Sequence, residues 1–150
     1  MTSRRLSKEI HEFVAERAGY CCEYCLSQKR YCPDSFDVDH VHPRAAGGAN
    51  VPSNLAFSCH GCNGSKQRAV SGIDPLTGER TPLFHPRQDD WSDHFHWSHD
   101  FLEMFGKTAK GRATVARLKL NREGVVNLRE ALAKLGRHPP RWVTPASRQE

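Results

Sequence analysis

The sequence lacks any apolar run near the roughly 20 residues that a transmembrane helix requires, and so we expect no membrane partner. Its first nine residues are charged and contain no apolar segment of the kind found in secretory signals, which predicts a cytoplasmic protein. Only 37% of the 150 residues are hydrophobic, and the mean hydropathy is −0.68. A core this lean often depends on a bound metal or a covalent crosslink. No internal repeat or low-complexity tract is present, and the length fits one compact core with an elaboration.

Acidic residues are fewer than basic ones: the sequence has 17 aspartates and glutamates and 22 lysines and arginines. The formal charge is therefore +5, and the pI is about 9.0. The imbalance is concentrated in residues 103–137, which hold nine Lys or Arg and three Glu. A basic surface favours DNA or RNA as a partner, although a solvated basic face has the same composition.

The first half of the chain predicts an α+β core. Apolar residues in 6–18 recur with helical spacing, with Ser7 or Ser3 as the cap and Gly19 at the end. Residues 35–41 alternate between apolar and polar, which indicates a strand, and 54–58 fit a return strand. Residues 59–70 then predict a turn leading into a basic helix. We therefore place a core with an N-terminal helix in residues 1–70.

Residues 71–150 form a predicted extension that packs on this core. The segment 72–93 is rich in proline and glycine and is expected to be mostly loop. Residues 94–98 and 101–105 are expected to pair as a hairpin. Basic helices are expected over 113–120 and 123–135, the second with Val126, Leu128, Leu132 and Leu135 mostly on one side. The extension is thus a mixture of hairpin and helix.

Two CxxC pairs predict a structural zinc site, with ligands Cys22, Cys25, Cys59 and Cys62. A CxxC turn directs two thiolates at one centre, and two such turns complete a closed tetrahedral site for Zn²⁺. Cys21 is an alternative to Cys22, but the two-residue spacing favours Cys22. Cys32 is expected to be a thiol that binds no metal. The 33 residues between Cys25 and Cys59 exceed the usual spacing of a zinc finger, and so a functional insertion is expected there.

The insertion contains groups suited to phosphodiester hydrolysis: the pair Asp39-His40, then Asn54, with Asn63 directly after the second CxxC pair. Such hydrolysis needs a base that activates water and a divalent cation that neutralises the developing charge. A hard cation such as Mg²⁺ prefers the oxygens of Asp39 and Asn63. Taken singly, these residues are as easily a surface pair, a turn residue and a helix cap. Because they are interleaved with the zinc motif, we expect them to form one active site.

The order Asp-His, Gly-Gly, Asn-Leu, CxxC-Asn and Lys over residues 20–68 resembles the HNH endonuclease family. The resemblance implies a ββα-metal fold in which His40 is the general base, Asp39 a metal ligand and Asn54 a brace for the loop. Asn63 stands at the third signature position, where it completes a site for Mg²⁺ or Mn²⁺. Residues after 71, such as Gly111-Arg112-Ala113, resemble an extension found in stand-alone bacterial HNH proteins.

The expected activity is therefore that of a metal-dependent endonuclease that nicks or cuts DNA, with RNA as the alternative substrate. Predicted nucleic-acid contacts are Lys66, Arg68, Lys107 and Lys110. The rival hypothesis is a zinc-knuckle nucleic-acid-binding or adaptor protein with a vestigial nuclease site. His42 is either a phosphate contact or an exposed loop residue, and no role is assigned to Asp37.

Overall fold

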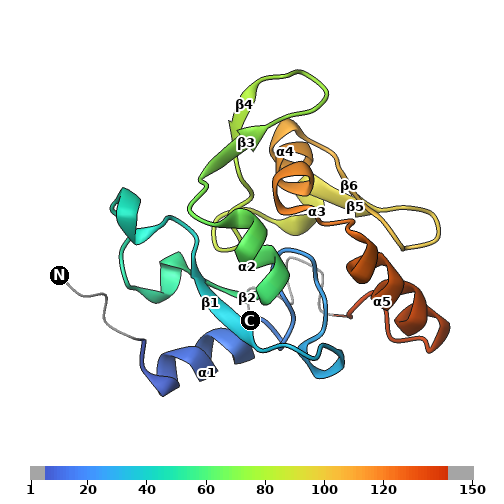
Figure 1. Cartoon of the computed structure of the whole chain (residues 1–150), viewed down its shortest axis with the longest axis horizontal. Helices are drawn as coiled ribbons and strands as arrows, with labels where there is room; N and C mark the ends of the chain where they lie inside the picture. The colour runs from blue at the N-terminus through green and yellow to red at the C-terminus, as the bar shows by residue number, and fades with distance from the viewer. Residues whose placement is uncertain (1–5, 142–150) are drawn as a thin grey trace.

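The computed structural model describes residues 6–141, and the alternative cap Ser3 lies outside this range. Three antiparallel hairpins and five α-helices are arranged along the described chain (Figure 1). The first half contains α1 (Lys8–Arg17), β1 (Phe36–His40), β2 (Leu55–Cys59) and α2 (His60–Lys66). The second half contains β3 (Ser71–Ile73), β4 (Arg80–Pro82), α3 (Trp91–His94), β5 (Phe95–Trp97), β6 (Met104–Gly106), α4 (Ala109–Leu118) and α5 (Glu123–Lys134).

The hairpin β1–β2 and the helix α2 form the predicted ββα unit. The two strands pair with Phe36 opposite Cys59 and His40 opposite Leu55. Strand side chains alternate between faces, and β1 accordingly directs Phe36 and Val38 toward α1 but Asp37 and Asp39 toward α2. The two helices therefore flank the hairpin, as Figure 1 shows. The α+β class and the ββα arrangement are confirmed.

Helix α1 begins where the sequence predicts, because the Ser7 side chain accepts a hydrogen bond from the backbone N–H of Ile10. Its buried residues Val14 and Ala15 pack with Leu55 and Phe57 of β2 in a small apolar cluster. The helix thus covers one face of β2 and leaves the opposite face of the hairpin to α2.

The extension shares its main apolar core with the cysteine-rich segment. Buried Tyr24 and the four predicted zinc ligands belong to one cluster with Phe84, Met104, Leu118 and Val125. Arg129 of α5 is also buried, and it donates hydrogen bonds to the carbonyl oxygens of Cys25, Leu120 and Leu102. Residues after 71 therefore contribute directly to the packing around the cysteine-rich segment.

Several predicted boundaries are wrong. The segment 72–93 is mostly loop, as predicted, but it also contains the short hairpin β3–β4 and the start of α3. Asp74 organises the tight turn of that hairpin by accepting bonds from Leu76 N and Thr77 Oγ1. Helix α4 starts at Ala109, four residues before the expected start, because Thr108 Oγ1 caps it by accepting from Gly111 N. Helix α2 ends at Lys66 rather than near 70, since Gln67 has a φ of 51°.

The buried face of α5 also differs from the prediction. Its buried residues are Val125, Arg129 and Leu132, whereas Leu135 is 68% exposed. Hydrophobic spacing identified the helix and its buried Leu132 but missed Val125 and Arg129, because a buried arginine does not register as a core residue in an apolar pattern.

Candidate active site and metal centre

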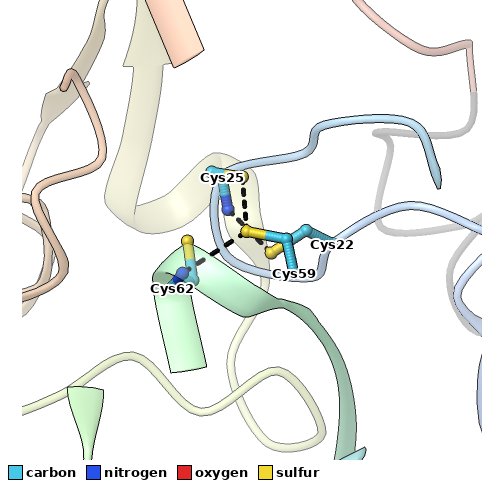
Figure 2. Close-up of side chains that lie close together, drawn as sticks. All are labelled: Cys22, Cys25, Cys59 and Cys62. Atoms are coloured by element: carbon cyan, nitrogen blue, oxygen red, sulfur yellow. Dashed lines mark hydrogen bonds between the residues drawn. The ribbon is translucent and has the colours of Figure 1, made fainter. Parts of the chain in front are cut away.

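The four cysteines of the two CxxC pairs converge in the interior (Figure 2). Their sulfur atoms all lie within 4.8 Å of one another, and all four residues are buried. Cys22 and Cys25 come from the turn after α1, while Cys59 ends β2 and Cys62 lies in the first turn of α2. Cys59 Sγ accepts from the backbone N–H of Cys62 at 3.4 Å, and Cys22 Sγ accepts from that of Cys25 at 3.4 Å. These bonds hold each CxxC turn in the conformation that presents both sulfurs.

The cluster fits a structural zinc ion. Burial raises the pKa of the Cys22 thiol well above its usual value, so a set of four thiolates in this position requires a cation. Four converging sulfurs match the ligand set of a closed tetrahedral Zn²⁺ site. Cys21 donates to Gly19 O and Cys32 to Gln28 O, both outside the cluster. Cys22, and not Cys21, therefore belongs to the four-cysteine cluster.

The face of β1 that points toward α2 carries the carboxylates Asp37 and Asp39, and α2 brings the amide of Asn63 to the same interface. Asn63 Nδ2 lies 3.2 Å from Asp37 Oδ2, and His60 Nδ1 lies 3.6 Å from the same oxygen. Asn63 and Lys66 lie about one turn apart on the same face of α2, and Asp37 and Asp39 lie on the same face of β1. Asn63 therefore faces Asp37, and Lys66 faces Asp39. The structure therefore places Asn63 against Asp37, for which sequence reasoning assigned no role, rather than against Asp39.

Asp39 is buried in a network of its own. Its side chain is 6% exposed, accepts a hydrogen bond from Tyr24 Oη at 2.8 Å and pairs with Lys66 Nζ at 3.2 Å. Burial raises the pKa of Asp39, against the opposing effect of the Lys66 ammonium. Lys66 is only 1% exposed and also donates to His40 O. The expectation that Lys66 contacts phosphate from the helix surface is wrong, because its ammonium points into the protein.

His40 is half-buried at the end of β1, with its Nε2 2.8 Å from Asn50 Oδ1. The segment after it is held by Asn54, whose side chain accepts from His42 N at 2.8 Å and donates to His42 O and Ala49 O. These three bonds tie both ends of the loop 42–49 to the start of β2. Asn54 thus fixes the backbone at Ala49, the residue directly before Asn50.

Comparison with known families identifies the segment that contains the cysteines and His40. The model of the HNH endonuclease family matches residues 22–69, which span both CxxC pairs, β1, β2 and α2. Residues 22–69 form an HNH endonuclease domain. No curated protein and no solved structure matches the chain. Among the helices of residues 6–141, none has the length and apolar character of a membrane span.

The cations predicted to contact nucleic acid lie in different surroundings around the HNH domain. Arg68 and Lys107 are exposed, although Lys107 Nζ donates to Ser92 O. Lys110 Nζ is 3.0 Å from Asp89 Oδ2, and so its charge is largely balanced within the protein. Arg68 and Lys107 are thus better placed for a phosphate than Lys110 or Lys66.

A cavity of about 420 Å³ lies where the HNH domain meets the extension. Val41, His42 and Lys66 line one side, and the segment 80–85 with Gln88 and Lys110 lines the other. The residues directly after His40 therefore border a hollow whose opposite wall comes from the extension.

Sequence reasoning missed Tyr24 and Asn50 as partners of the central Asp-His pair. Neither has a sequence signal, since Tyr24 lies inside a CxxC pair and Asn50 in a loop rich in glycine and alanine. Their contacts with Asp39 and His40 exist only in the folded chain.

Proposed function

We propose that this protein is a metal-dependent endonuclease that hydrolyses DNA phosphodiester bonds, with His40 as the general base. The observation that carries the proposal is the position of His40 within the HNH domain. Its ring is anchored to Asn50 at the end of β1, beside a loop braced by Asn54. An oriented histidine at a strand end is suited to accept a proton from water at neutral pH.

The contact with Asn50 favours one tautomer of His40. When Nε2–H donates to Asn50 Oδ1, the lone pair lies on Nδ1, which can then accept the proton of an attacking water. The role of Asn50 is to hold the imidazole plane, as the partner of a catalytic histidine commonly does. Asn54 acts one step further away by fixing the loop on which Asn50 stands.

The proposed catalytic cation is Mg²⁺ or Mn²⁺, with Asp39 and Asn63 as its predicted ligands. Bound there, such an ion would stabilise charge on the phosphate and leaving oxygen. Carboxylate oxygens on the α2-facing side of β1, together with the amide oxygen of Asn63 on α2, are the kind of ligand that a hard cation prefers. The ion would have to share Asp39 with the Lys66 ammonium, since that pair occupies the buried carboxylate. Asp37, adjacent to Asn63, adds a more accessible oxygen donor to the same face.

DNA is the proposed substrate, with Arg68 and Lys107 as phosphate contacts. A phosphate contact releases counterions, so the loss of each should make the dependence of log binding on log salt shallower by about one unit. Arg68→Gln and Lys107→Gln should each show this change when titrated against labelled duplex DNA by fluorescence anisotropy. An unchanged slope in both variants would assign the two cations to the solvated surface.

The deciding experiment compares wild type with His40→Ala on supercoiled plasmid, with and without Mg²⁺ or Mn²⁺. Loss of a general base is expected to slow nicking about 10²–10⁴-fold, while zinc content and DNA binding stay near wild type. His99→Ala is the matched control, because His99 is an exposed histidine away from β1. Equal nicking by wild type and His40→Ala at equal zinc content would refute the assignment.

The rival function, a zinc-knuckle binding or adaptor protein with a vestigial site, predicts a different outcome. Wild type would then bind DNA or RNA without cleaving either in the presence of any divalent ion. Parallel assays on labelled single-stranded RNA and duplex DNA separate the two substrates. The anchored His40 favours the enzyme, because binding alone does not require an oriented base.

A further inference from the structure

The extension places a guanidinium directly on the four-cysteine site. Arg122 follows α4 and directly precedes the first residue of α5, and its Nη2 lies 3.4 Å from Cys59 Sγ and 3.6 Å from Cys62 Sγ. Its Nη1 lies 3.6 Å from Cys62 Sγ and also donates to the carbonyl oxygens of Leu118 and Lys119. The end of α4 thus fixes the guanidinium in position before any metal is considered.

The second CxxC turn is shaped to admit this guanidinium. Gly61 lies between Cys59 and Cys62, and a Cβ at Gly61 would stand 2.6 Å from Arg122 Nη2. That distance is too short for a real contact, and the flexible end of Arg122 would have to move away. The absence of a side chain at residue 61 is therefore what allows Arg122 to reach both sulfurs.

Arg122 covers the more accessible side of the cluster. Cys59 is 8% exposed, whereas Cys22, Cys25 and Cys62 are fully buried. A cavity of about 350 Å³ opens beside it, lined by Cys59, Gly61, Arg122, Cys32 and Leu128 among others. A proton or a small chelator that enters through this cavity reaches Cys59 first, and the Arg122 guanidinium is in contact with the sulfur of Cys59.

We propose that Arg122 is a positioning residue of the metal centre that stabilises the Cys59 and Cys62 thiolates and so controls how slowly the site releases Zn²⁺. Four thiolates around Zn²⁺ carry a net charge of −2, which is costly in a buried place unless it is offset. Hydrogen bonds from a cation to the thiolates offset part of this charge and favour the ionised sulfur. Partners of metal ligands typically change metal affinity by about 10–100-fold when they are removed. The extension thus determines the stability of a metal site whose ligands all belong to the HNH domain.

The test measures zinc transfer from the full-length, zinc-loaded protein to the chelator 4-(2-pyridylazo)resorcinol. Arg122→Gln should release zinc about 10-fold faster or more. Arg122→Lys should recover part of the wild-type rate, because it restores the charge with fewer donors. Lys119→Gln is the matched control, since it removes an exposed cation from the same segment without touching a sulfur.

Gly61→Ala provides a second, independent perturbation, because it displaces the guanidinium while leaving the charge of Arg122 in the chain. Faster release from Gly61→Ala and Arg122→Gln, with Lys119→Gln at the wild-type rate, supports the proposal. Wild-type release from Arg122→Gln, or equal acceleration by Lys119→Gln, overturns it. If Arg122→Gln does not fold, wild-type release from Gly61→Ala overturns it equally. None of these rates depends on nuclease activity.

Discussion

Replacing Lys66 with alanine should destabilise the fold rather than merely weaken DNA binding. Lys66 and Asp39 are 1% and 6% exposed, and their charged atoms are 3.2 Å apart. Removing the ammonium leaves a buried carboxylate whose remaining side-chain donor is Tyr24 Oη. Breaking a buried pair in this way typically costs about 3–5 kcal/mol. For a chain of this size each kcal/mol lowers Tm by about 2–4 °C, so a fall of about 6–20 °C is expected.

The assay is thermal unfolding of zinc-loaded protein followed by circular dichroism, with Arg68→Ala as the control. Arg68 is exposed, two residues along, and its loss should change stability by less than about 0.5 kcal/mol. The double variant Lys66→Met with Asp39→Asn should recover much of the loss, because no buried charge then remains unpaired. An unchanged Tm for Lys66→Ala, together with a shallower salt dependence of DNA binding, would refute the burial argument and restore Lys66 as a surface contact.

The stability loss caused by Lys66→Ala should also depend on pH, in a direction that the pKa of Asp39 determines. Burial already raises the pKa of Asp39, and the Lys66 ammonium is the largest of the interactions that oppose that shift, ahead of Tyr24 and His40. An acid whose pKa is higher in the folded state binds its proton more tightly there, so stability falls as pH rises above its unfolded pKa of about 3.9. Lys66→Ala should therefore be more destabilising at pH 8 than at pH 5. A loss that is equal at both pH values would indicate that packing, rather than the unpaired carboxylate, accounts for the effect.

Three further predictions concern other parts of the molecule. Asn50→Ala should slow plasmid nicking less than His40→Ala, because it leaves the base in place but unoriented; equal losses would make Asn50 part of the chemistry. Cys21→Ser and Cys32→Ser should retain one zinc per chain by elemental analysis, and loss of zinc from either would revise the ligand set. Arg112 holds the pKa of Asp74 well below its usual range, so that contribution to stability is fully present above about pH 4 and is lost progressively as pH falls from there toward the folded-state pKa. Asp74→Asn should thus reduce the fall in the urea midpoint between pH 5 and pH 3, and an identical fall would contradict the pairing.

The metal centre was predictable from sequence because each half of it is local. A CxxC turn brings two sulfurs together through bonds within four residues, such as Cys62 N to Cys59 Sγ. The order of the Asp-His pair, Asn54 and Asn63 between and beside these turns was enough to identify the family that the comparison reports. Helix α1 was equally accessible, since an apolar stripe and the Ser7 cap are properties of adjacent residues.

The extension was predicted less well, since its elements are short and depend on distant partners. Each strand of the hairpin β3–β4 has only three residues. Its turn is held by the contact of Asp74 with Arg112, which lies 38 positions later in the chain. Arg129 occupies a core position of α5 because backbone carbonyls from three other segments accept its hydrogen bonds. No local pattern signals that a charged residue will find such partners.

The sequence by itself selected the residues for which we propose chemical roles: four cysteines at CxxC spacing, and His40, Asp39, Asn54 and Asn63 in family order. Only the tertiary structure decided what surrounds each of them. Lys66 turns inward to Asp39, and Arg122 reaches Cys59 from 63 positions away. The reason is physical: spacing along the chain specifies turns and periodic faces, whereas the partner of a buried charge depends on which distant segments pack beside it.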